Sequence, residues 1–381
     1  MSKARELAEL GAVYDSGALS NRNLIINGAM QVAQRGTSFT TVTDSTYTLD
    51  RFNYRKGNDG EVTITQDSSA PDGFSNSLKI DVTTADTSIA ASQFAILEYN
   101  VEAQDLQRLA FGTSGAKNFT LSFYVKSNKT GTYAVNISQT DNSSKQATLT
   151  YTINSANTWE RKSLTFTGDT SGVINDDNGI GFLMYWWLAA GSTFTSGSTS
   201  ATFQTYSNAN HAAGQAVNLL DDTSNEWLIT GIQLEVGSEA TPFEHRSFDE
   251  EFRRCSRYYQ HSNSTGVKPT NGSNSTSFGT GYRALAAVNI WGGSTAGRVW
   301  EMVRDAPMRA TPTATKFGND SGYFACISHG STSAPNSDNT VTFHENLMIR
   351  TEDACFISFD NQSSGNTVWG VMGGFELDAE L

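Results

Sequence analysis

The 381-residue chain has a formal net charge of -13, with 38% hydrophobic, 11% aromatic and only 17% charged residues, and its length allows two or three domains. Its 21 Phe, 13 Tyr and 7 Trp exclude a disordered chain, because disordered sequences combine few aromatic residues with high charge. The acidic balance, without a Lys/Arg cluster, also excludes a nucleic-acid-binding protein, since phosphates must be neutralised by grouped cations.

The first ten residues, MSKARELAEL, predict a short helix that Ser2 caps and Gly11 ends. Charges interrupt this segment, so it lacks the apolar core of a secretory signal. Leu7 and Leu10 lie on its apolar side, and a helix this short is marginal in water by itself. We therefore expect residues 1–22 to form a helix and linker that is frayed or held by a partner, with Leu7 and Leu10 as candidate oligomer-interface residues.

From residue 23 to residue 246 the hydrophobic residues recur at every second position, which predicts strands with one buried and one wet face. Asn118–Lys126 (NFTLSFYVK) is the clearest example. The same period occurs at Val62–Ile64, Leu78–Val82, Tyr133–Ile137, Leu164–Phe166 and Leu228–Val236. Gly, Asn, Asp and Ser clusters between these segments predict turns. Many short strands with little helix indicate an all-β fold, and we predict a jelly-roll β-sandwich over residues 23–246.

The longest apolar run is Phe182–Ala190 (FLMYWWLAA). It is shorter than the ~20 residues that a transmembrane helix needs, so it predicts a buried strand and no membrane insertion. Its adjacent Trp186 and Trp187 must face opposite sides of that strand. We therefore expect one of them in the core and the other as a candidate surface platform.

Residues 247–260 break the alternation and predict a connecting helix. Ser247 followed three residues later by Glu250 is a capping-box signature. Phe248, Phe252 and Tyr259 then recur at helical spacing on one side. Two interpretations stay open: a helix that packs on its own domain, or a helix at a symmetry axis where these aromatic residues form an oligomer interface.

Strands resume in residues 261–381, which we predict to be a smaller C-terminal β-sandwich. The candidate strands are Tyr282–Trp291, Thr313–Phe317, Val341–Phe343, Phe356–Phe359 and Val368–Leu377. Sugar recognition uses aromatic rings that stack on sugar faces, with amides and hydroxyls bonding the OH groups. The candidate ligand-binding residues of this domain are Trp291, Tyr282, Trp300, Tyr323 and Trp369. Each is alternatively a core aromatic residue, and Trp291 before two glycines is the best candidate for an exposed loop.

The cysteines, Cys255, Cys326 and Cys355, are far apart and odd in number, which indicates reduced thiols. With five scattered His and no close Cys pair, we predict neither a metal site nor a cofactor. The polar-loop carboxylates Asp176-Asp177 and Asp221-Asp222 leave calcium binding open.

No catalytic residues are predicted. Glycoside hydrolysis needs two carboxylates roughly 5–10 Å apart, and the acidic cluster Asp249-Glu250-Glu251 is explained by a helix N-terminus, where acidic side chains are favourable. No G-x-S-x-G nucleophile motif occurs in the sequence. We therefore expect a binding protein and not an enzyme.

Three blocks of sequence carry a family resemblance. The blocks are Asn23–Ser38 (NLIINGAMQVAQRGTS) with Tyr47–Phe52 (YTLDRF), Trp227–Tyr259 (WLITGIQLEVGSEATPFEHRSFDEEFRRCSRYY), and Met308–Thr313 (MRATPT) with the terminal Phe375–Leu381 (FELDAEL). Together they resemble tail-fibre or receptor-binding proteins of marine, cyanophage-like tailed bacteriophages. Within these blocks, Asn27-Gly28 is expected to form a turn, and Arg51 and Arg246 are expected to pair internally.

The resemblance implies a homotrimer located in the virion and made in the host cytoplasm. It implies that residues 1–22 attach to another virion protein, that the middle domain is a carbohydrate-binding-module-like jelly roll, and that residues 261–381 form the tip that meets a host surface polysaccharide. The hypothesis is a non-enzymatic phage tail fibre. A capsid fibre or tail connector with a purely structural role, and a polysaccharide-degrading tailspike, remain alternatives.

Overall fold

The computed structural model describes residues 21–141, 145–261, 298–303, 308–310, 313–317, 325–328, 341–343, 349–350, 354–361, 368–372 and 374–380. The chain divides into two compact units. The first holds the described residues up to Ala33 and from Thr37 to Glu251, and the second holds Gln34–Gly36 with the described residues from Phe252 to Glu380. Within the described residues no helix is long and apolar enough to cross a bilayer.

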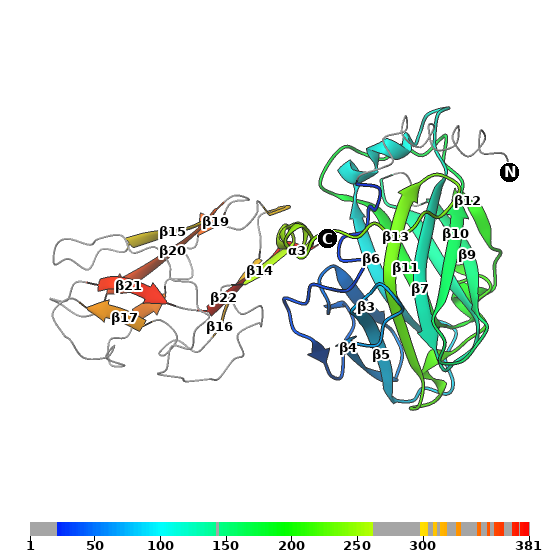
Figure 1. The fold of residues 1–381 in the computed structure, drawn as a ribbon, viewed down its shortest axis with the longest axis horizontal. Helices are drawn as coiled ribbons and strands as arrows, with labels where there is room; N and C mark the ends of the chain where they lie inside the picture. Colours follow the sequence, from blue (N-terminus) through cyan, green and yellow to red (C-terminus); the bar gives the residue numbers. More distant parts are fainter. Residues whose placement is uncertain are drawn as a thin grey trace. The chain divides into compact units, whose positions relative to one another are not determined.

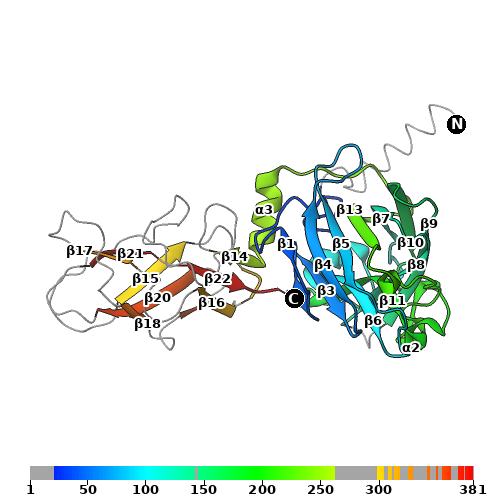
Figure 2. The same cartoon turned by 90° about the horizontal axis from the view of Figure 1, so that it is seen from below.

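The first unit is a sandwich of two antiparallel sheets, drawn in blue to green in Figures 1 and 2. The six-stranded sheet has the order β1 (Ser38–Phe39), β4 (Glu61–Asp67), β5 (Ser77–Thr84), β13 (Glu226–Val236), β7 (Phe119–Ser127) and β10 (Glu160–Phe166). The seven-stranded sheet has the order β12 (Ser200–Thr205), β9 (Lys145–Ile153), β8 (Gly131–Gln139), β11 (Ile180–Ala190), β6 (Phe94–Glu102), β3 (Phe52–Lys56) and β2 (Thr46–Tyr47). The short helical segments are η1 (Ala103–Leu109), α2 (Ser192–Thr195), η2 (Asn208–Asn210) and η3 (Leu219–Asp221).

Alternation of side chains builds the core between the two sheets. On β7 every second residue from Phe119 to Val125 is fully buried in one hydrophobic cluster. Phe119 lies opposite Phe166 of β10, and their rings stack at 5.2 Å. Because neighbouring strands pair in the same phase, one face of each sheet is apolar and closes on the other. The all-β, jelly-roll prediction is confirmed.

Strand β11 confirms the buried strand predicted from Phe182–Ala190 and corrects the prediction for its tryptophans. Trp186 lies in the core, edge-on to Phe123 at 6.1 Å. Trp187 faces the other way but is only 1% exposed, because the segment after β11 folds back and lays Phe194 and His211 against it. Trp187 is therefore the centre of a second small apolar cluster and not a surface platform.

Strand β13 contains a bulge that the simple period-two pattern missed. Trp227 and Ile229 face the core, the register with β7 shifts between Thr230 and Gln233, and Ile232 and Leu234 then face the core. Gly231 sits in this bulge with φ 61°, a conformation that glycine adopts at little cost. The phase of the strand therefore changes, and Leu228, predicted to share a face with Ile232, lies outside the core cluster.

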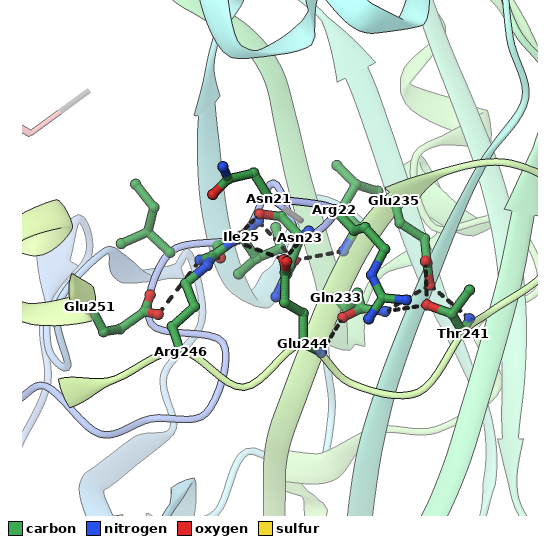
Figure 3. Close-up of polar contacts among 12 residues, drawn as sticks. Asn21, Arg22, Asn23, Ile25, Gln233, Glu235, Thr241, Glu244, Arg246 and Glu251 are labelled. Atoms are coloured by element: carbon green, nitrogen blue, oxygen red, sulfur yellow. Dashed lines mark hydrogen bonds and ion pairs between the residues drawn. The ribbon is translucent and has the colours of Figure 1, made fainter. Parts of the chain in front are cut away.

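The first two sequence blocks meet at the edge of this strand (Figure 3). The side chain of Asn23 donates to the carbonyl of Ile232 at 3.0 Å and accepts from the amides of Ile25 and Leu234 at 2.9 and 3.1 Å. The amide of Asn23 donates to Glu244 at 2.8 Å. The segment that begins at Asn23 therefore satisfies its buried polar groups by hydrogen bonds to β13 and to the chain that follows β13.

Arg246 completes this junction from the same return segment (Figure 3). Its guanidinium donates to the carbonyls of Ile25 and Asn23 and lies 3.5 Å from both Glu244 and Glu251. The internal pairing predicted for Arg246 is confirmed. Arg51 is also internal, with a donation to the carbonyl of Asn100 at 2.6 Å.

The turn predicted at Asn27-Gly28 is confirmed. Asn27 has φ 61°, and its carbonyl accepts from the amide of Met30 at 2.9 Å. Gly28 lies so close to β13 that an added Cβ would stand 2.2 Å from the carbonyl oxygen of Ile232. The glycine is required by this close approach of two backbones.

Helix α3 (Phe248–Ser256) begins after Ser247, whose Oγ accepts from the amide of Glu250 at 3.3 Å, and this is the N-cap half of the predicted capping box. The helix ends at Ser256 and not at residue 260. The chain turns there, since the amide of Tyr258 bonds the carbonyl of Cys255 at 2.9 Å, and Tyr259 begins a strand. Cys255 is buried on the helix.

The strands described in the second unit are antiparallel. Its sheets are β14 (Tyr259–His261), β22 (Gly374–Asp378) and β16 (Thr313–Phe317); β15 (Arg298–Val303), β20 (Ala354–Asn361), β18 (Val341–Phe343) and β19 (Ile349–Arg350); and β17 (Ala325–Ser328) with β21 (Val368–Met372). β16 and β18 have the predicted bounds, and the predicted strand 368–377 is two strands.

Arg35 is the central charged residue where strands β14 and β22 of the second unit pair. Its guanidinium lies 3.1 Å from Asp378, 3.3 Å from Glu380 and 3.8 Å above the ring centroid of Tyr259. The first block therefore meets the ends of the second and third blocks through a single cation. Ion pairing and ring stacking together explain why an arginine suits this position.

Candidate functional site

A row of polar side chains crosses the outward face of the seven-stranded sheet. Neighbouring members lie directly opposite each other on paired strands. We call this set the polar row: Tyr47, Asn53, Glu98, Tyr185, Asn136 and Thr148. From β3 to β9 the residues on either side of each member belong to the core or pack against it, so alternation turns the members outward and the strand order brings them side by side.

Glu98 on β6 is the centre of the polar row. It is 3% exposed and accepts hydrogen bonds from Asn53 at 3.1 Å, Asn100 at 3.4 Å and Arg55 at 3.2 Å. A buried carboxylate is tolerated when donors surround it. These bonds hold the neighbouring amides in fixed orientations.

Arg55 on β3 forms the accessible edge of this cluster. Its side chain is 34% exposed, and its Nε also lies 3.0 Å from Asp44. Burial raises the pKa of Asp44, but hydrogen bonds from the Lys56 amide and from Arg55 outweigh that effect and hold it below its usual range. Arg55 is therefore shared by two carboxylates and carries no surplus charge.

Two further rings, His211 and Tyr206, lie beside Tyr185 of the polar row. The ring of His211 lies edge-on to Tyr185 at 5.6 Å and to Tyr206 at 4.9 Å. Tyr206 is 40% exposed, and its hydroxyl donates to Asn208 at 2.6 Å. Burial raises the pKa of Tyr185, with a further contribution from Glu98, and burial lowers that of His211 to about 4. Both side chains are therefore uncharged near neutral pH.

Unsatisfied polar atoms border the same face. Oδ1 of Asn53, Nε2 of His211 and Nε1 of Trp187 are buried without a hydrogen-bond partner in the structure. Such atoms are rare in native proteins, where an ordered water commonly satisfies them. The accessible groups of this face are Arg55 and the rings of Tyr47, Tyr185 and Tyr206, which lie beside buried amides held in fixed orientations. A guanidinium, hydroxyls and rings together are a combination that binds a molecule with many hydroxyl groups.

The aromatic ligand-binding residues predicted for the C-terminal domain are not tested by the structure. Tyr282, Trp291 and Tyr323 lie outside the described residues. Trp300 lies on β15 and Trp369 on β21, where the backbone alone is described. Whether these rings form one surface stays a prediction.

The predicted oligomer-interface residues are similarly divided. Leu7 and Leu10 lie outside the described residues. On α3, Phe248 is 56% exposed and Phe252 is partly exposed. Tyr259 belongs to β14 and not to the helix, and it is buried beneath Arg35 within its own chain. An interface at these residues stays a prediction.

Three of the carboxylates considered for catalysis or calcium have structural partners. Asp221 binds Lys129 at 2.5 Å, Asp177 accepts from the amide of Gly179 at 2.8 Å, and Glu251 contacts Arg246 at 3.5 Å. In the part of the chain that the structure describes, no group of three or more His, Cys, Asp or Glu is placed to hold a metal ion.

Comparisons with known proteins bear on the fold alone. No protein-family model and no curated protein matches the chain. One similar structure is the enzymatically active domain of tailspike protein 4 of bacteriophage CBA120, with 11% identity, TM-score 0.31, and coverage of 56% of this chain and 21% of that chain. A sugar-binding protein of Bacteroides thetaiotaomicron, described as putative in its title, has 16% identity, TM-score 0.33, and 57% and 100% coverage.

A third similar structure is the family 11 carbohydrate-binding module of a Clostridium thermocellum cellulase, with 12% identity, TM-score 0.29, and coverage of 53% of this chain and 97% of that module. The fold is a jelly-roll β-sandwich. Identities this low carry no residue role over to this chain, so the candidate site stands on its geometry.

Sequence reasoning missed the polar row because its members are scattered from residue 47 to residue 148 and beyond. One signal was present: β6, β8 and β11 each place polar or aromatic residues at alternate outward positions, as in Glu98-Tyr99-Asn100. Strand order is needed to bring those positions together, and the alternation does not specify it.

Proposed function

We propose that the polar row of the seven-stranded sheet binds a glycan of the host surface. The observation that carries the proposal is the cluster in which buried Glu98 fixes Asn53 and Arg55 beside the ring of Tyr185. Sugar hydroxyls both donate and accept, so they pair with amides and carboxylates, and the apolar faces of sugars pack on rings. Preorganised groups bind at a lower entropy cost than mobile ones.

The wider role we propose is that of a phage tail fibre that attaches the virion to its host without cutting the glycan. The resemblance of the three sequence blocks supports this role. Two of them meet at Asn23 and Arg246, and Arg35 joins the first to the third. On this proposal the chain is a homotrimer in the virion, joined to another virion protein through its N-terminal segment.

Glycan binding is tested with the purified chain on host envelope polysaccharide. Tyr185→Ala and Arg55→Gln are expected to weaken binding at least about tenfold, or ~1.4 kcal/mol, because each removes a group that lines the row. Arg108→Gln changes an exposed arginine of η1 and serves as the matched control. Equal binding by all variants would contradict the proposal, provided that their melting temperatures match.

The remaining parts of the proposal have separate tests. Light scattering is expected to give about three times the 41.2 kDa chain mass, and a monomer at micromolar concentration would contradict the trimer. Gold-labelled antibody is expected to mark the tail of the virion, and a capsid location would favour a head fibre. The appearance of new reducing ends in the polysaccharide would overturn the non-enzymatic role.

A further inference from the structure

A strip of aromatic and cationic side chains lies on the outward face of the other, six-stranded sheet. Tyr124 and Lys126 point outward from β7, since Phe123 and Val125, which alternate with them, belong to the core. Arg161 on β10 is the direct cross-strand partner of Tyr124. Nζ of Lys126 lies 5.7 Å from the ring centroid of Trp159. Two cations and two rings therefore share one patch of the sheet.

Three further rings extend this patch over the bulge of β13. The ring of Phe74 lies 5.4 Å from Tyr124, 5.0 Å from Phe243 and 5.2 Å from His245. Gly231 lies directly beneath Phe74 and Tyr124. The members of this aromatic-cationic strip, all at least partly exposed, are Trp159, Lys126, Arg161, Tyr124, Phe74, Phe243 and His245.

The two cations of the strip are not neutralised by carboxylates. Nζ of Lys126 donates to Oγ of Ser69 at 2.8 Å, and Arg161 donates to the carbonyl of Thr241 at 2.5 Å. Neither forms an ion pair with any described residue of this chain, although the chain as a whole carries a net charge of -13. The stacking of Lys126 on Trp159 orients the ammonium group and leaves its charge in place.

The neighbouring charges on this face show the contrast. Lys79, on β5 of the same sheet, lies 2.9 Å from Asp81 and 2.7 Å from Glu226, so it is neutralised. Asp72 and Glu239, two exposed carboxylates in turns near Phe74 and Phe243 in the sequence, form no ion pair with the strip. The positive charge is therefore concentrated where the rings are.

We propose that the aromatic-cationic strip is a second carbohydrate-binding surface and that it takes an acidic polysaccharide. The rings pack on the apolar faces of the sugars, while Lys126 and Arg161 contact the anionic group that the sugars carry. The charge complementarity argues for this occupant, because bare cations beside rings have nothing else to pair with. Arg55 of the polar row is already shared by two carboxylates, so the two faces select glycans of different charge.

The test compares polygalacturonate with its fully methyl-esterified form, which keeps the backbone and removes the charge. The unmodified chain is expected to bind polygalacturonate, with affinity that falls as salt rises, and to bind the ester at least about tenfold more weakly. The double variant Lys126→Gln with Arg161→Gln is expected to lose about tenfold in affinity for polygalacturonate, since each exposed ion pair contributes modestly.

The matched control is Lys117→Gln with Arg108→Gln, which removes the same charge from exposed positions elsewhere in the first unit. The control and Tyr185→Ala are both expected to retain polygalacturonate binding, so this result is independent of the polar row. The proposal is overturned by no binding, by equal binding of the ester, or by an equal loss in the control. Self-association that only the strip variant abolishes, without polygalacturonate binding, would assign the strip to a second copy of the chain.

Discussion

Arg55 and Glu98 form an ion pair at 3.2 Å on the face of the sandwich that points away from its core. Glu98 is 3% exposed, whereas the side chain of Arg55 is 34% exposed. The pair therefore has a buried end, which fixes the amides around it, and an open end, which contacts the glycan on the proposed function. Changing Glu98 tests how much the ion pair stabilises the fold, and changing Arg55 tests whether the pair takes part in binding.

Glu98→Gln is expected to lower the free energy of unfolding by about 2 kcal/mol. The substitution keeps the shape but removes the charge that Arg55 and Asn53 donate to, and hydrogen bonds to charged groups contribute about 1.5–3 kcal/mol. Urea titration at constant m measures the loss. Glu61→Gln, which removes a more exposed pair with Lys56 at 3.1 Å, is expected to cost less than about 1 kcal/mol. Equal losses would show that Glu98 has no special place in the row.

His211 is expected to make the sandwich less stable as the pH falls below about 6.5. Burial lowers its pKa from 6.5 to about 4, so between these values the unfolded chain binds more protons than the folded chain. The free energy of unfolding therefore rises with pH across that window by about 3 kcal/mol in total. Above the window His211 no longer lowers it.

The measurement is the urea midpoint of the chain between pH 4 and pH 7. His211→Gln is expected to flatten the dependence. An unchanged slope in the His211 variant would show that this imidazole is protonated in the folded chain or remains hydrated.

Period-two patterning predicted the sandwich well because burial on a two-sided sheet depends mainly on local alternation. It failed at β13, where a glycine bulge at Gly231 shifts the phase, and at Trp187, where a later segment covers an outward position. The two errors have different causes. A bulge changes which residues share a face within the strand itself, whereas the residues that fold over an outer face come from elsewhere in the chain and are not specified by the strand.

The end of α3 shows the same limit at a helix. Its start at Ser247 was predictable from local hydrogen bonding, whereas its end at Ser256 was not. The spacing that placed Tyr259 on the helix is equally compatible with the strand β14, which pairs with the distant β22. Pairing with β22, more than a hundred positions away in the sequence, places Tyr259 in a strand, and the guanidinium of Arg35 lies over its ring.

Arg246→Met is expected to destabilise the first unit by about 3 kcal/mol. The arginine side chain is 4% exposed and donates to the carbonyls of Asn23 and Ile25. The apolar replacement leaves these buried carbonyls without a donor and the Glu251 carboxylate without its cation. Thermal unfolding measures the loss. Arg161→Gln, which changes an exposed arginine, is expected to cost less than about 0.5 kcal/mol, and a similar cost for both would mean that the junction is rebuilt by water.

Gly231→Ala tests the stability of the fold and the aromatic-cationic strip together. The residue has φ 61°, and an added Cβ would lie 2.7 Å from the ring of Phe74 and 2.9 Å from that of Tyr124. Backbone strain of about 1 kcal/mol adds to the displacement of a ring, so we expect a loss of about 2–3 kcal/mol. Gly73→Ala, with φ 90° and nothing within 4 Å of an added Cβ, is expected to show the strain alone.

The two glycine variants also differ in the predicted effect on ligand binding. Displacement of Phe74 removes a ring from the strip, so Gly231→Ala is expected to weaken polygalacturonate binding, while Gly73→Ala is expected to retain it although it lies next to Phe74 in the sequence. Both variants should be compared at a temperature at which each is fully folded. If Gly231→Ala binds as tightly as the unmodified chain, the rings over the bulge cover β13 and take no part in recognition.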